Sequence, residues 1–220
     1  MKVDAILFDF DGVLIESEYA GNKQVAEYLS GIGHPTTPEE SMAHFMGLAG
    51  MEFLAAVERY IMRPLPEDFH TVREAENIRA MEEGVGEVAG AIAFVRGLPP
   101  ELPKAIVSSS STRWIRRHLD HIGLGDAFGP HVYSGREHVT RGKPAPDLYL
   151  YGAAQLGVPI ERCAIVEDSP VGATGAAASG GHVIGLCAGS HCGIGHAEKL
   201  RAIGVDVAAH DFDEVARLFA

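Results

Sequence analysis

The residues best suited to chemistry are Asp9 and Asp11, in the segment Asp9-Phe10-Asp11-Gly12-Val13-Leu14. This segment follows the apolar run Ala5-Ile6-Leu7-Phe8, which predicts a buried strand. Residues i and i+2 of an extended chain point the same way, so both carboxylates leave the strand on one side. Such a pair can supply a nucleophile and a proton donor and acceptor. Because buried carboxylates repel each other, the pair indicates a bound divalent cation rather than a solvated turn.

Two further motifs carry groups that suit an anionic ligand. Ser108-Ser109-Ser110-Ser111-Thr112 follows the apolar run at residues 105–107. Hydroxyl and backbone N–H groups at a strand end can hold phosphate oxygens, although Ser and Thr are also ordinary helix caps. Lys143 lies in Gly142-Lys143-Pro144-Ala145-Pro146-Asp147. Its ammonium can place a point charge on a phosphate or on a carboxylate, unless it is an ordinary surface lysine.

A fourth motif, Val166-Glu167-Asp168-Ser169, follows another apolar run. Its two acids can complete an oxygen-rich site for a small hard cation; the alternative is a solvated turn that caps a helix. Ligands of an open α/β sheet bind at the carboxyl ends of the strands. We therefore expect the four motifs to converge.

The elements that must position these motifs alternate along the chain from residue 86 onward. Strands are predicted at residues 104–107, 132–133, 163–166 and 182–186, and helices at 88–96, 113–122, 148–156 and 172–178. With the first strand at residues 3–8, this alternation predicts a parallel sheet covered by helices on both faces.

Residues 16–82 are rich in Glu, Ala, Met and Arg and poor in β-branched residues, and they predict helices at 19–29, 51–61 and 68–81. This segment interrupts the α/β pattern. We therefore expect an α/β core domain of residues 1–15 and 86–220, with an inserted helical domain of residues 16–85. Hinges are expected at residues 14–17 and 82–86, where Gly84 and Gly86 suit a bend.

Together, the four motifs in this order resemble those of the haloacid dehalogenase superfamily of hydrolases. The resemblance covers nearly the whole chain. It is greatest to the branch with a helical cap after the first motif, which includes β-phosphoglucomutases and sugar-phosphate phosphatases. It implies an α/β fold with a Rossmann-like parallel sheet and an all-helical cap that closes over an active site between the domains. The implied activity is Mg²⁺-dependent hydrolysis of a small phosphomonoester, a sugar or polyol phosphate, through an aspartyl phosphate.

The resemblance also implies roles for the residues that react with or hold the phosphoryl group. Asp9 is the implied nucleophile. Asp11 is the implied general acid and base, and its backbone carbonyl is implied to bind Mg²⁺. Ser108 is implied to bind the transferring phosphoryl group, with Ser109 or Ser110 adding hydrogen bonds.

The remaining implied roles concern charge. Lys143 is implied to balance the charge on the nucleophile and to bind the phosphate, and Asp168 to bind Mg²⁺, with Glu167 binding it directly or through water. The implied metal-site residues are thus Asp9, Asp11, Glu167 and Asp168. These roles suit phosphoryl transfer, in which negative charge spreads over the equatorial oxygens and Mg²⁺ takes octahedral oxygen ligands.

Two alternatives remain open. The dehalogenases of the superfamily lack the second aspartate, so Asp11 favours phosphoryl transfer, which leaves a β-phosphoglucomutase-like mutase as one alternative. Such mutases carry a histidine and an arginine that residues 16–21 and 46–51 lack, which favours a phosphatase, although Arg73 and Arg79 are possible second phosphate grips. The other alternative is a non-catalytic phosphosugar-binding regulator, against which the intact motifs argue.

Composition sets further expectations. The net charge of −12 argues against unaided binding to nucleic acid or anionic membrane, but a local site with a metal and a lysine can still take an anion. The three cysteines, at no metal-like spacing, fit a reducing compartment, and no apolar stretch approaches the ~20 residues that span a bilayer. We expect a cytoplasmic monomer or small homo-oligomer whose partner is a small phosphorylated molecule.

Two groups of residues are interpreted as structural. His182, His191, Cys192 and His196 lack the tighter four-ligand spacing of a zinc site and are predicted to lie in a polar loop after the last strand. Trp114, among Arg113, Arg116 and Arg117, is assigned to core packing beside a solvated helix face.

Overall fold

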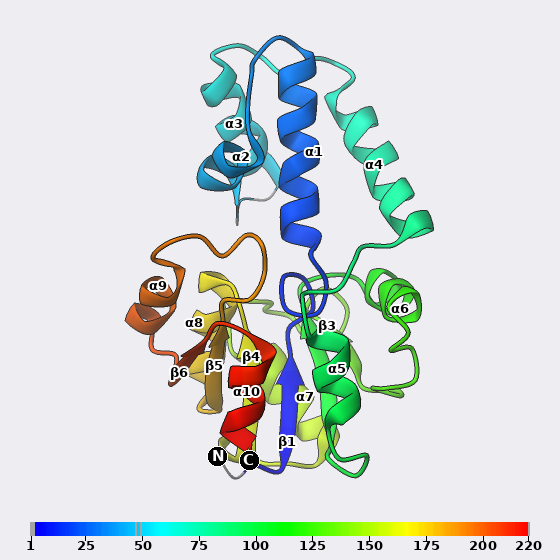
Figure 1. The fold of residues 1–220 in the computed structure, drawn as a ribbon, viewed down its shortest axis with the longest axis vertical. Helices are drawn as coiled ribbons and strands as arrows, with labels where there is room; N and C mark the ends of the chain where they lie inside the picture. The colour runs from blue at the N-terminus through cyan, green and yellow to red at the C-terminus, as the bar shows by residue number, and fades with distance from the viewer. Residues whose placement is uncertain (1–2, 47, 49, 220) are drawn as a thin grey trace. The chain divides into compact units, whose positions relative to one another are not determined.

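A computed structural model of the chain describes residues 3–46, 48 and 50–219. It contains a parallel six-stranded sheet in the order β3-β2-β1-β4-β5-β6 (Figure 1). The strands are β1 (Ala5–Phe8), β2 (Lys104–Ser108), β3 (Val132–Ser134), β4 (Cys163–Glu167), β5 (His182–Leu186) and β6 (Val207–Ala209). The expected α/β fold is confirmed.

The register of the central strands brings the motif residues together. Phe8, the last residue of β1, lies opposite Ile106 of β2 and Val166 of β4. The chain therefore leaves all three strands at the same edge of the sheet. Because the strand order runs outward from β1 in both directions, the gap between β1 and β4 is a topological switch point, where open α/β sheets bind ligands.

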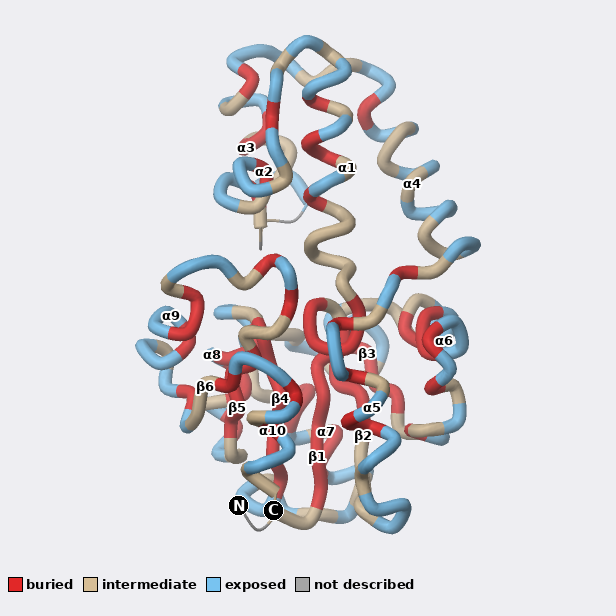
Figure 2. The backbone as a smooth tube through the Cα atoms, viewed as in Figure 1, coloured by how far each residue is buried: buried red, intermediate tan, exposed pale blue. Residues whose placement is uncertain are grey.

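Helices cover both faces of the sheet. They are α5 (Ala91–Gly97), α6 (Thr112–His121), α7 (Asp147–Leu156), α8 (Pro170–Ser179), α9 (His196–Ile203) and α10 (Phe212–Phe219), with a short 3₁₀ turn η1 (Ile160–Arg162). Leu7 of β1 is in a core cluster with Tyr149 of α7 and Ala173 of α8, whereas Phe8 stacks edge-on against Phe94 of α5. The alternation of side chains along a strand explains this division. The strands are largely buried (Figure 2).

Residues Ser17–Val85 form a separate compact unit, distinct from the unit made of residues up to Glu16 and from Gly86 onward. The separate unit consists of α1 (Ser17–Gly31), α2 (Pro38–Phe45), α3 (Gly50–Ile61) and α4 (Phe69–Glu83). Its core is an apolar cluster centred on Leu29, Phe45 and Val57. None of the described helices is both long and apolar enough to cross a membrane.

Besides the turn η1, the sequence prediction missed three helices and one strand. Helix α2 has a local signal that was overlooked: Thr37 and Glu40 form a reciprocal capping box, and Pro38 occupies the first turn. The expected loop does follow β5, but β5 is not the last strand, because α9, β6 and α10 come after that loop. These elements give weak signals: the cap of α9 is a glycine, and β6 has three residues. The stretch 46–51, compared above with that of the mutases, is described only in part, because Gly47 and Ala49 lie outside the described residues.

Candidate active site

Asp9 lies at the end of β1, where its backbone N–H donates to the carbonyl of Val166 on β4. The Lys143 ammonium donates to Oδ1 of Asp9 and to Oε1 of Glu167, at 2.5 Å in each case. All three side chains are buried. Lys143, in the loop before α7, thus bridges Asp9, which follows β1, and Glu167, which ends the neighbouring strand β4.

Carboxyl groups outnumber the one ammonium in this group. Burial raises the pKa of Asp9 well above its ordinary value, and the neighbouring carboxylates of Glu167 and Asp168 add to the effect, while Lys143 opposes it. Burial by itself lowers the pKa of Lys143, but its ion pairs with Asp9 and Glu167 outweigh burial and raise it. The lysine therefore stays charged and lies among three carboxyl groups. Such an oxygen-rich group suits a hard cation.

Glu167 is held by donors at both of its carboxylate oxygens. Besides the lysine, the Tyr149 hydroxyl lies 2.7 Å from Oε1, and Oε2 accepts from the backbone N–H groups of the next two residues and from the Ser169 hydroxyl. Burial raises the pKa of Tyr149 well above its ordinary value, so this hydroxyl stays a donor. The carboxylate packs on Gly172, where a Cβ would lie 2.0 Å from Oε1. Glu167 is therefore fixed in one position.

Asp11 meets the residues that follow β2. The Ser110 hydroxyl donates to its Oδ2 at 2.6 Å, and the Trp114 indole N–H donates to its Oδ1 at 3.0 Å. The hydroxyl of Ser108 lies 3.4 Å from the same Oδ2. Ser109, by contrast, is exposed. The interpretation of Trp114 as a packing residue was therefore incomplete, because its ring packs against His118 at a tilt while its N–H donates to Asp11.

Asp168 is held by two histidines. The Nε2 atom of His191 lies 2.7 Å from its Oδ2, and Nε2 of His196 lies 2.6 Å from its backbone carbonyl oxygen. Both rings are buried, and burial lowers the pKa of His196. The predicted loop does contain His191, but the ring of His191 packs inward and His196 begins α9.

The predicted site residues thus fall into two groups around the end of β1. Asp9, Lys143, Glu167 and Asp168 form one, and Asp11 and Ser108 form the other. One ligand atom from each of Asp9, Glu167 and Asp168 lies within 4.8 Å of the others, an arrangement that can hold a metal ion. These donors are all oxygens, so the set fits a hard cation such as Mg²⁺.

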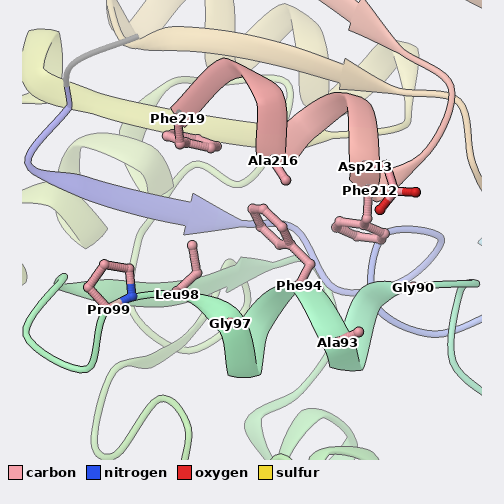
Figure 3. Close-up of a pocket in the computed structure, with 10 residues that line it drawn as sticks. All are labelled: Gly90, Ala93, Phe94, Gly97, Leu98, Pro99, Phe212, Asp213, Ala216 and Phe219. Carbon is pink, nitrogen blue, oxygen red and sulfur yellow. The ribbon is translucent and has the colours of Figure 1, made fainter.

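A pocket of about 430 Å³ lies elsewhere on the α/β unit (Figure 3). It lies between α5 and α10 and is lined mainly by apolar residues such as Phe94, Phe212 and Phe219. The motif residues are not among those that line it. We therefore assign the chemistry to the strand-end cluster, because charged groups are gathered there.

Comparisons with known proteins identify the family of the chain. The family of haloacid dehalogenase-like hydrolases matches residues 3–180. Hexitol phosphatase A of Escherichia coli (strain K12) is 32% identical over 98% of this chain and 94% of its own. The 6-phosphogluconate phosphatase of the same strain is 26% identical over 86% of this chain and 85% of its own.

Solved structures share the whole fold. A HAD family hydrolase from Deinococcus radiodurans R1, with bound phosphate and sodium, superimposes with a TM-score of 0.89 at 33% identity over 100% of this chain and 96% of its own. A putative beta-phosphoglucomutase from Thermotoga maritima, 24% identical over 98% of both chains, shares the fold with a TM-score of 0.74. The expected family resemblance is confirmed: the chain belongs to the haloacid dehalogenase-like hydrolases and is a phosphatase.

Proposed function

We propose that the protein is a Mg²⁺-dependent phosphatase that hydrolyses a small sugar or polyol phosphate through an aspartyl phosphate on Asp9. The observation that carries this proposal is the buried group in which Lys143 joins Asp9 to Glu167, beside Asp168. The sugar-derived substrates in the names of the two Escherichia coli relatives support the substrate class.

The residues that would hold Mg²⁺ are Asp9 and Asp168, through their carboxylates, and Asp11, through its backbone carbonyl. Glu167 is not placed among the direct ligands, because both of its carboxylate oxygens already accept hydrogen bonds. When bound, Mg²⁺ offsets the negative charge of the phosphoryl group and of the attacking carboxylate.

The side chains divide the chemistry into two steps. In the first, an Asp9 oxygen bonds to phosphorus as the bond to the leaving oxygen breaks, and Asp11 gives that oxygen a proton. In the second, Asp11 takes a proton from a water molecule that attacks the aspartyl phosphate, so inorganic phosphate leaves and Asp9 is restored. Lys143 and Ser108 bind the phosphoryl oxygens throughout, which lowers the energy of the charged transition state.

One of the two possible second phosphate grips in the helical unit is already paired, which favours hydrolysis over a mutase reaction. Arg73, one of two possible second phosphate grips, forms an ion pair with Glu76 at 2.5 Å and lies 3.5 Å from Oε1 of Gln24. Its charge is therefore already balanced. A mutase needs a second phosphate-binding group because it must hold a bisphosphate intermediate while that intermediate reorients in the site.

We expect Mg²⁺-dependent phosphate release from a few phosphorylated sugars or polyols. The measurement is inorganic phosphate released from a panel of sugar, polyol and nucleotide monophosphates, with Mg²⁺ and with EDTA. Equal release in EDTA would contradict the metal dependence. No release from any compound, together with isomerisation of hexose 1-phosphates, would identify the mutase instead.

Trp114→Phe is expected to lower kcat roughly 10- to 100-fold with little change in KM. The substitution keeps an aromatic ring against His118 but removes the N–H that holds Asp11, and a hydrogen bond to a charged group is worth about 1.5–3 kcal/mol. Steady-state kinetics measure the effect, with exposed Arg113→Gln on the same helix turn as control. An unchanged kcat would show that the indole N–H does not position Asp11.

The cytoplasm remains the proposed location. The three cysteines are free in the structure, which accords with a reducing compartment. A monomer or small homo-oligomer remains the expected assembly.

A further inference from the structure

The loop of residues 187–195, between β5 and α9, belongs to none of the four motifs, yet it reaches the candidate metal site. His191, from this loop, lies with Nε2 2.7 Å from Oδ2 of Asp168. His196, the residue directly after the loop, lies with Nε2 2.6 Å from the backbone oxygen of Asp168. The histidines thus contact both the side chain and the main chain of one implied Mg²⁺ ligand.

The orientation of His191 is fixed by close packing against two glycines. A Cβ at Gly189 would lie 2.5 Å from Cε1 of the ring, and a Cβ at Gly12 would lie 2.9 Å from the same atom. Gly12 also has a φ of +81°, which favours glycine. The imidazole therefore sits between the turn after β1 and the loop after β5, with little room to rotate.

The loop is itself tied to the turn after β1. The backbone N–H of Ser190 lies 3.0 Å from each carboxylate oxygen of Glu16, and the Ser190 hydroxyl donates to Oε1 at 3.0 Å. The backbone N–H and the hydroxyl of Ser190 thus both donate to the Glu16 carboxylate. This contact places the neighbouring His191 beside Asp168.

We propose that His191 is a positioning residue for the metal site: it holds the Asp168 carboxylate in the orientation that binds Mg²⁺, and the Glu16–Ser190 contact holds His191. The inference rests on the proposed Mg²⁺ dependence. Without a donor, the Asp168 carboxylate would turn away from the like charges of Asp9 and Glu167, because carboxylates repel at this distance. The Nε2–H group of the His191 imidazole, 2.7 Å from Oδ2, supplies that donor.

The same histidines also form a group with Cys192 whose ligand atoms lie within 4.8 Å of one another. We do not assign a second metal site there. Nε2 of each ring is already directed at an oxygen of Asp168, so binding a metal through these atoms would break the contacts that hold the aspartate.

The test measures Mg²⁺ binding directly, by isothermal titration calorimetry of the full chain. His191→Leu removes the donor, whereas His191→Gln keeps an N–H donor in a side chain of similar reach. We expect Kd for Mg²⁺ to rise roughly 10- to 100-fold in His191→Leu, as for other residues that orient metal ligands, and clearly less in His191→Gln. The control His210→Gln alters an exposed histidine and is expected to match wild type.

Kinetics give a second readout, because saturating Mg²⁺ is expected to restore most of the kcat of His191→Leu. An unchanged Kd in folded His191→Leu would overturn the inference. If that variant does not fold, Glu16→Ala carries the test: a several-fold rise in Kd supports the inference, and an unchanged Kd overturns it. Failure of the proposed function is distinct, because wild type would then bind no Mg²⁺.

Discussion

Asp9→Asn is expected to abolish phosphate release while leaving the fold intact. The amide cannot attack phosphorus, and removing the nucleophile of a group that acts as a unit costs on the order of 10⁶-fold in kcat. Asparagine has nearly the same shape as aspartate, and its amide oxygen can still accept from Lys143, which keeps its bond to Glu167. Phosphate release measures the loss of activity, and far-UV circular dichroism measures whether the fold is retained.

The control for Asp9→Asn is Asp126→Asn, an identical change at an exposed position, which is expected to keep wild-type activity. Activity within tenfold of wild type in Asp9→Asn would remove Asp9 from the role of nucleophile. Acid-stable 32P labelling of the protein by substrate that persists in Asp9→Asn would be a second sign, because the label is expected on Asp9 alone.

The same variant has a stability consequence with a definite sign. Burial and the nearby acids raise the pKa of Asp9 in the folded protein above its ordinary value of 3.8. The stability that an acid with a raised pKa contributes is present below its unfolded pKa and is lost as the pH rises through its folded pKa. In EDTA at neutral pH, Asp9→Asn is therefore expected to unfold at a higher temperature than wild type. The difference should shrink as the pH falls toward 4.

Thermal unfolding in EDTA at several pH values checks this sign. A lower unfolding temperature for Asp9→Asn at neutral pH would mean that the ion pair between Asp9 and Lys143 outweighs the cost of burial. With Mg²⁺ present the order should reverse, because a ligand that binds only the folded state stabilises it, and wild type has the stronger site.

Asp11→Asn is expected to lower kcat by about 10²–10⁴-fold, the usual contribution of a general acid or base. Asparagine keeps an oxygen that accepts from Trp114, but it cannot transfer a proton. The loss should be smaller for a nitrophenyl phosphate than for a sugar phosphate while the first step limits the rate, because a good leaving group needs no proton.

Measuring Mg²⁺ binding distinguishes the role of the Asp11 side chain from that of its backbone carbonyl. Its implied metal contact is the backbone carbonyl, so calorimetry should give a Kd for Asp11→Asn close to that of wild type. Loss of Mg²⁺ binding would contradict this assignment and place the side chain among the ligands. Because Trp114 is the only tryptophan and bonds to this side chain, its emission spectrum should change in the variant.

Much of the fold was predictable because its signals are local. The apolar run Ala5–Phe8 identifies β1, and the alternation of apolar runs with helical patterns identifies a parallel sheet. Short elements with weak local signals were missed, as β6 was, since two of its three residues are alanine, which is depleted in strands. Helix α2 did carry a signal, the capping box of Thr37 and Glu40, and was predictable in principle.

The sequence by itself predicted that the motif residues following the strands converge, because parallel strands bring their carboxyl ends to one edge, while the pairing of Asp9 with Lys143 was only implied by the family resemblance. Only the tertiary structure decided what holds these groups. Trp114 meets Asp11 across 103 positions of the chain, and His191 meets Asp168 from a loop that no motif marks. The physical reason is that a hydrogen bond between distant segments depends on packing and register, which leave no local pattern in the residues that make it.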